Sequence, residues 1–204
     1  MWGGIGFVRS IWKRRRTLVK TWLVIASAAV LSAAVLVGPS RAVTIGLTDP
    51  SGLSAEVEFS LLDASTLQVR AKNTSSGAPD GFDSSDQILT SVSWNFGGLT
   101  SIASGGVVTG PASSSVNFSV ANVGPGADVS GEYGYGNGGT TGLNANFISA
   151  NESHATPFGG SNLDGPVGLN VPQGGLIASP AVVPLGGLGA IQDEWIATLA
   201  LSDP

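Results

Sequence analysis

The chain has no cysteine, one histidine and one methionine among its 204 residues. Without cysteine it can form no disulfide and no thiolate metal site, and it cannot be a lipoprotein acylated on cysteine. A zinc site built around one histidine would need several carboxylates, which is rare. Because no disulfide can form, the folded chain has to be held together by its core alone.

Positive charge is scarce beyond residue 42. Seven of the nine Lys and Arg residues lie within residues 1–42, and all fourteen Asp and Glu residues come later. Residues 43–204 therefore hold two basic against fourteen acidic side chains, a net charge of −12. A chain this acidic is not expected to bind nucleic acid or an anionic surface by electrostatics.

Residues 1–42 have the three parts of a secretory signal peptide. The first twenty residues carry six basic side chains and no acid, and Thr21–Val37 has no charge. A Gly-Pro breaker and the small residues Ser40 and Ala42 follow. Small side chains fit the shallow pockets of signal peptidase. We therefore expect an N-terminal signal helix, cleavage after Ala42 by signal peptidase, and passage through the export machinery to the cell envelope or the medium.

Two alternatives to this reading stay open. The apolar run is a little shorter than the roughly 20 residues that span a bilayer, yet it could serve as an uncleaved N-terminal anchor. The pair Arg15-Arg16, with Leu18 and Lys20 after it, resembles the twin-arginine export motif. An ordinary basic n-region would give the same pattern.

Alternation of apolar and polar residues predicts a hairpin. In "SAEVEFSLL" and "TLQVRAKN" every second side chain is apolar, and "DAS" lies between them. Folding the hairpin about Ala64 places Glu58 opposite Arg70 and Glu56 opposite Lys72. Facing opposite charges contribute roughly 0.2–1 kcal/mol per pair. The basic residues beyond residue 42 are thus interpreted as cross-strand partners.

Further short strands separated by Gly, Pro, Ser and Asn clusters predict the fold class. The expected strands are "ILTSVSWNF", "TSIASGGVVT", "SVNFSV", "SGEYGYG", "LNANFISA" and "EWIATLAL". This spacing is typical of an all-β fold, and we expect a single antiparallel, jelly-roll-like β-sandwich over residues 43–204. The Gly- and Pro-rich residues 156–189 predict a long ordered loop laid over it, because that stretch is too apolar for a disordered linker.

Three aspartates stand at every third position, Asp80, Asp83 and Asp86, in "PDGFDSSD". A helix-loop-helix calcium site takes its oxygens from alternate residues and closes with a glutamate, so this spacing does not match. We interpret the three carboxylates as turn formers that accept backbone N–H bonds. An irregular calcium site is the alternative, and calcium is the one cofactor that the sequence suggests.

A ligand site is suggested by Tyr133 and Tyr135, which share one face of any strand that contains both. With Trp94 they could form a platform for sugar stacking, although such residues more often pack in a core. Catalytic signatures are few: His154 lies in a polar segment and no G-x-S-x-G motif occurs. A glycosidase needs only two carboxylates, so a secreted hydrolase stays an alternative, with no catalytic residue assigned.

Several stretches together resemble bacterial exosortase-dependent surface proteins of the PEP-CTERM type. They are "SGLSAEVEFSLLDASTLQVRAKNTSSGAPDGFDSSDQILTSVSWNF", "GPGADVSGEYGYGN", "TPFGGSNLDGP" and "LGGLGAIQD". The resemblance covers most of residues 53–193 and is most specific between Leu67 and Trp94.

The resemblance implies export, attachment at the cell envelope, and a β-sandwich ectodomain at the cell surface or in the extracellular matrix. Because catalytic signatures are few, we expect a non-catalytic protein. Exosortase is an expected partner if a sorting tail exists, and extracellular polysaccharide is a further candidate partner. That tail is a Pro-Glu-Pro-like motif, an apolar helix and a basic cluster, whereas this chain ends "EWIATLALSDP". We therefore expect either a fragment of a sorted protein or a freely secreted copy. The alternatives are a secreted carbohydrate-binding module and a secreted hydrolase.

Overall fold

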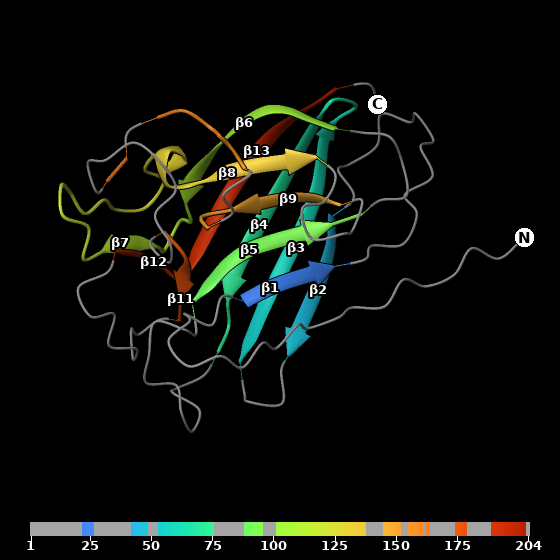
Figure 1. The fold of residues 1–204 in the computed structure, drawn as a ribbon. Coiled ribbons are helices and arrows are strands. Elements are labelled where there is room, and N and C mark those ends of the chain that lie inside the picture. The colour runs from blue at the N-terminus through green and yellow to red at the C-terminus, as the bar shows by residue number, and fades with distance from the viewer. Residues whose placement is uncertain are drawn as a thin grey trace, which may run out of the picture.

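The computed structural model describes ten ranges of the chain, and the strands in them form two sheets (Figure 1). These ranges are residues 22–26, 42–48, 53–75, 88–95, 101–137, 145–151, 155–160, 162–163, 174–178 and 189–202. The all-β, sandwich-like fold predicted from the sequence is confirmed. Within these ranges, no helix is long and apolar enough to cross a membrane.

The first sheet has five antiparallel strands in the order β2-β3-β4-β13-β6. Their bounds are Ala42–Thr48 for β2, Ser54–Asp63 for β3, Thr66–Asn73 for β4, Ser101–Thr109 for β6 and Glu194–Ser202 for β13. β13 holds the "EWIATLAL" stretch, and it is the strand that joins the β2-β3-β4 meander to β6.

The second sheet has eight strands, and β5 lies at its centre. Seven follow the order β10-β8-β9-β5-β11-β12-β7, and β1 pairs with β5 beside them. The bounds are Trp22–Ala26 (β1), Leu89–Trp94 (β5), Ser114–Val116 (β7), Gly134–Asn137 (β8), Asn146–Ser149 (β9), Thr156–Pro157 (β10), Leu176–Ile177 (β11) and Ala190–Gln192 (β12). A short 3₁₀ turn, η2 (Ser130–Glu132), precedes β8.

The predicted hairpin is confirmed with its register. β3 pairs with β4 so that Glu58 faces Arg70 and Glu56 faces Lys72. The alternating residues divide between a buried face and a partly exposed face along most of both strands. This division follows from the period of two, since every second side chain of a strand lies on the same side of a sheet.

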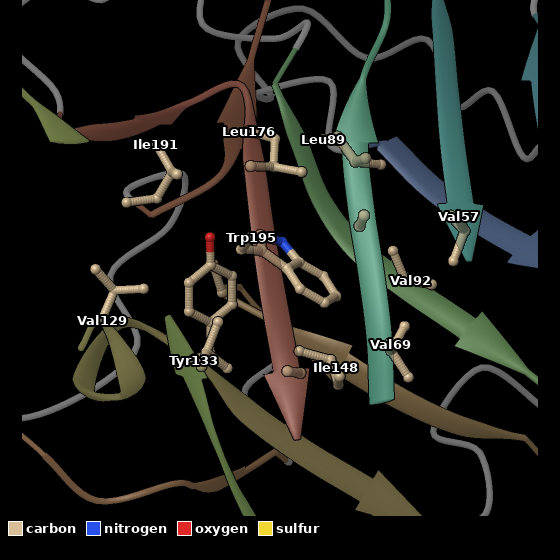
Figure 2. Close-up of a cluster of buried hydrophobic side chains, with 14 of the residues drawn as sticks. Val57, Val69, Leu89, Val92, Val129, Tyr133, Ile148, Leu176, Ile191 and Trp195 are labelled. Atoms are coloured by element: carbon tan, nitrogen blue, oxygen red, sulfur yellow. The ribbon is translucent and has the colours of Figure 1, made fainter. Parts of the chain in front are cut away.

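Apolar side chains from both sheets meet in one core (Figure 2). The five-stranded sheet contributes Val57 and Val69, and the eight-stranded sheet contributes Val92 and Ile148, all without exposed surface. Trp195 of β13 packs beside Tyr133, with ring centroids 5.8 Å apart. In a chain without cysteine this contact between sheets is the main source of stability, because each fully buried Val or Leu contributes roughly 1.5–3 kcal/mol.

Four details differ from the sequence-based expectation. The structure describes only Trp22–Ala26 of the predicted signal helix, and these residues form strand β1, which pairs in parallel with β5. The other residues of 1–41 lie outside the described ranges. β11 and β12 are also parallel, so the larger sheet is mixed rather than antiparallel. Ala42 begins β2, a strand that the sequence analysis missed. The predicted loop at 156–189 contributes β10 and β11, and β11 is a buried strand of the sheet rather than a loop laid over it.

Candidate functional site

The outer face of the five-stranded sheet carries a charged cluster centred on Arg70 of β4. Arg70 Nη2 donates to Glu194 Oε2 at 2.7 Å, and Arg70 Nη1 lies 3.8 Å from Glu58 Oε2. The Glu194 side chain is only 4% exposed, whereas that of Arg70 is 38% exposed. The hydrogen bond to Glu194, and then the neighbouring carboxylate charges, raise the pKa of Arg70 above its ordinary value. Arg70 is thus held as a cation between carboxylates on both sides.

Lys72 takes a partner that the sequence did not suggest. Its Nζ lies 3.8 Å from Asp193 Oδ2, while Asp193 Oδ1 accepts a hydrogen bond from Ser113 at 3.0 Å. Both of the new acidic partners, Asp193 and Glu194, lie where β13 begins beside β4. The register with Glu56 and Glu58 was readable from the hairpin alone. The contribution of β13 was not, because it comes from about 120 residues further along the chain.

Glu194 is buried because the chain makes room for it at Gly110. A Cβ added to Gly110 would come within 2.4 Å of Glu194 Oε1. The Gly110 N–H also donates to the Glu194 carbonyl oxygen at 2.9 Å. Glu194 Oε1 has no hydrogen-bond partner within the described part of the chain. The cluster therefore acts as a clamp of β13 onto β4, held by one charge-assisted hydrogen bond to a buried carboxylate.

Two of the three aromatic residues predicted as a sugar platform lie in the core. Trp94 has no exposed surface and packs edge-on against Phe59 at 5.4 Å between ring centroids. Tyr133 is 1% exposed, and its hydroxyl donates to the carbonyl oxygen of Gly174. Burial, and then the charge of Glu132, raise the pKa of Tyr133 well above its ordinary value of 10.0. Neither ring presents a face on which a sugar could stack.

Tyr135 is the member of that set that reaches the surface. Its ring lies against Phe158, with centroids 5.0 Å apart and planes inclined by 32°. Its hydroxyl donates to the carbonyl oxygen of Ala103 in β6 at 2.8 Å. The two tyrosines are two residues apart, but one packs between the sheets and the other lies over the edge of β6. The prediction of a ligand platform therefore reduces to Tyr135.

Polar side chains near Tyr135 cover the outer edge of β6. Asn137 accepts from the Ile102 N–H at 2.6 Å and donates to the Ile102 carbonyl oxygen at 2.7 Å, as a neighbouring strand would. Ser130 Oγ does the same for Val107, at 2.8 and 3.3 Å. The sequence analysis missed these residues, because no sequence pattern indicates which strand edge a side chain amide or hydroxyl will cover.

The structure does not describe the three aspartates weighed as a calcium site or the single histidine. Asp80, Asp83, Asp86 and His154 all lie outside the described residues. Within the described ranges, no group of three or more His, Cys, Asp or Glu side chains is placed to hold a metal ion. The predicted cleavage residue Ala42 is exposed at the first position of β2.

No protein-family model, curated protein or solved structure matches this chain.

Proposed function

We propose that this chain is an exported, non-catalytic structural protein of the cell surface or extracellular matrix, of the exosortase-dependent type that its sequence resembles. Three sequence features support the proposal: a basic and then apolar leader, a small-residue end at Ala42, and a net charge of −12 beyond it. A large negative charge keeps an exported domain soluble.

The proposal of a non-catalytic role is supported by the polar side chains, which form hydrogen bonds and ion pairs within the fold. Arg70 and Glu194 clamp two strands together, and Ser130 and Asn137 cover a sheet edge. The phenol of Tyr133 is bonded inside the core. Each of these groups is committed to holding the sandwich together, which suits a protein whose role is to persist outside the cell.

Export is tested by expressing the full chain with a C-terminal epitope tag in a bacterial host and separating cytoplasm, envelope and medium. We expect the protein in the envelope or the medium, with Val43 as its first residue. Ala42→Trp should block cleavage, since signal peptidase accepts only small side chains at that position, and the exposed side chain makes no demand on the fold. Thr44→Trp is the matched control, because Thr44 is equally exposed and lies beyond the cut. Uncleaved wild-type protein in the cytoplasm would refute the proposal.

The alternative of a carbohydrate-binding module rests on Tyr135. Binding on a glycan array that is lost in Tyr135→Ala and retained in Tyr135→Phe would favour it, because the second variant keeps the ring and removes only the bond to Ala103. A hydrolase would be favoured by turnover of a glycan or an ester that is lost on substituting His154 or one carboxylate.

A further inference from the structure

The two outer strands of the five-stranded sheet are β2 and β6, at opposite ends of the sheet (Figure 1). The free side of β6 is occupied. Asn137 and Ser130 bond to it as described above, the Thr109 N–H donates to Ala127, and an isolated bridge joins Val108 to Asp128. These contacts satisfy the backbone groups that an outer strand otherwise presents to a second chain.

No segment in the described part of the chain covers the free side of β2 in this way. Among the described residues, the backbone of β2 pairs with β3 and with no other segment. The pairing runs from Ala42 to Thr48 without a bulge, and five of the seven residues are exposed. The strand "AVTIGLT" has no charge and no proline. Charge, proline and bulges are the usual protections of a sheet edge, so β2 can accept another strand.

The side chains of β2 are arranged so that the strand matches a reversed copy of itself. Val43, Ile45 and Leu47 face three buried residues of β3, so they lie on the core side of the sheet. The facing residues are Phe59, Val57 and Ala55. Ile45 and Leu47 are partly buried, and Val43 is exposed. In an antiparallel pair centred on Ile45, Val43 faces Leu47 and Ile45 faces its own counterpart. The apolar row of one sheet then continues into the next.

On the outer side of the sheet, the small residues of one copy face small residues of the other. Centring on Ile45 places Thr44 opposite Gly46 of the other copy, and both residues remain after cleavage behind Ala42. No charged side chain lies in the contact, although residues 43–204 carry a charge of −12. An edge without charge offers nothing to a basic or acidic peptide, whereas apolar-to-apolar matching about a two-fold axis fits a second copy of this chain.

We propose that β2 is a self-association edge, through which two copies join their five-stranded sheets into one continuous antiparallel sheet. A contact of the five residues 43–47 per copy is small for a stable dimer, so the affinity in solution is micromolar or weaker. The relevance of so weak an association rests on the proposed function. At a cell surface or in a matrix, neighbouring copies are held close together, which raises their effective concentration. Repulsion between the two acidic copies makes the association stronger at high salt.

The test is the double variant Thr44→Lys/Gly46→Lys, followed by sedimentation equilibrium of the protein as purified from the producing cells. Within one copy, Thr44 faces Glu58 and Gly46 faces Glu56, so each new lysine gains a cross-strand carboxylate. A side chain at Gly46 meets nothing within 4 Å. Across the self-paired edge, however, each introduced lysine directly faces another. We expect the dissociation constant to rise about tenfold.

The matched control is Ala103→Lys/Ser104→Lys on β6, where both side chains are exposed and the change in net charge is the same. It should leave association unchanged. A wild-type protein that is monomeric at every concentration and salt would overturn the proposal. So would association that survives Thr44→Lys/Gly46→Lys, because the contact would then lie elsewhere.

A second test examines the register of the proposed strand pair. Because the chain has no native cysteine, a single introduced cysteine can form a disulfide only with its counterpart in another copy. Ile45→Cys faces itself across the proposed axis. Facing Cα atoms of an antiparallel pair lie about 4.5–5.5 Å apart, within the roughly 4.4–6.8 Å that a disulfide spans, so mild oxidation should give a linked dimer. Ala103→Cys on the covered edge should stay monomeric. Failure of Ile45→Cys to link while the wild type is a dimer would refute this register. Both tests use purified protein, so they can fail while export succeeds, and the reverse also holds.

Discussion

The clamp between Arg70 and Glu194 allows a quantitative test of what holds the five-stranded sheet together. In Arg70→Met the Glu194 carboxylate, 4% exposed, loses the donor at 2.7 Å. Its other oxygen already has no hydrogen-bond partner in the described ranges. Removing one partner of a buried ion pair costs about 3–5 kcal/mol. Because Arg70 is 38% exposed and water can partly replace it, we expect about 2–3 kcal/mol.

Lys72→Met is a matched control for this substitution. The Lys72 side chain is 37% exposed, close to Arg70, and it lies on the same face and the same strand. Its partner Asp193 is 3.8 Å away and 16% exposed. A pair of this kind contributes about 0–1 kcal/mol. The two variants remove the same charge and a similar side chain, so the difference between them measures the burial of Glu194.

The double variant Arg70→Met/Glu194→Met tests the cause. Replacing a buried ion pair by apolar side chains of similar size is often neutral or stabilising, so it should lie within about 1 kcal/mol of wild type. Unfolding by urea, followed by the fluorescence of buried Trp94 and Trp195, gives each free energy of unfolding. If Arg70→Met costs no more than Lys72→Met, or if the double variant is less stable than Arg70→Met, the clamp is not the source of stability inferred here.

Three further outcomes are expected. Burial raises the pKa of Tyr133 above 10.0, so its contribution to stability is complete below pH 10 and is lost as the pH rises toward the pKa of the folded protein. Above pH 10 the melting temperature should therefore fall less steeply with pH in Tyr133→Phe than in wild type. Equal slopes would contradict this. Gly105→Ala should lower stability by about 1–3 kcal/mol, since its Cβ would lie 2.6 Å from the Thr198 carbonyl oxygen, whereas Gly46→Ala, with open space around it, should be neutral in chemical denaturation. A chelator should leave the melting temperature unchanged if the aspartates at 80, 83 and 86 form turns; a decrease that Asp83→Asn abolishes would establish calcium instead.

The sequence by itself determined the features that depend on neighbouring residues. Alternation in "SAEVEFSLL" and "TLQVRAKN" specified the β3-β4 hairpin down to the pairing of Glu58 with Arg70. The same pattern indicated most of the strands and hence the all-β fold, because a period of two places side chains on opposite faces whatever they pack against. It did not indicate β1 in the leader, β2 directly after it, or the two- and three-residue strands β10, β11 and β12.

Only the tertiary structure decided the features that depend on distant residues. Glu194 meets Arg70 because β13 lies between β4 and β6, and the sheet order is not written in any local pattern. Tyr133 and Tyr135 share a local pattern, yet one is enclosed between the sheets and the other lies over a strand edge. The two edges of the five-stranded sheet also differ: Asn137 and Ser130 cover β6, whereas no described residue covers the free side of β2. Contacts between residues far apart in the chain decide which polar groups form hydrogen bonds within the fold and which strand edge is covered. Local sequence does not encode these contacts.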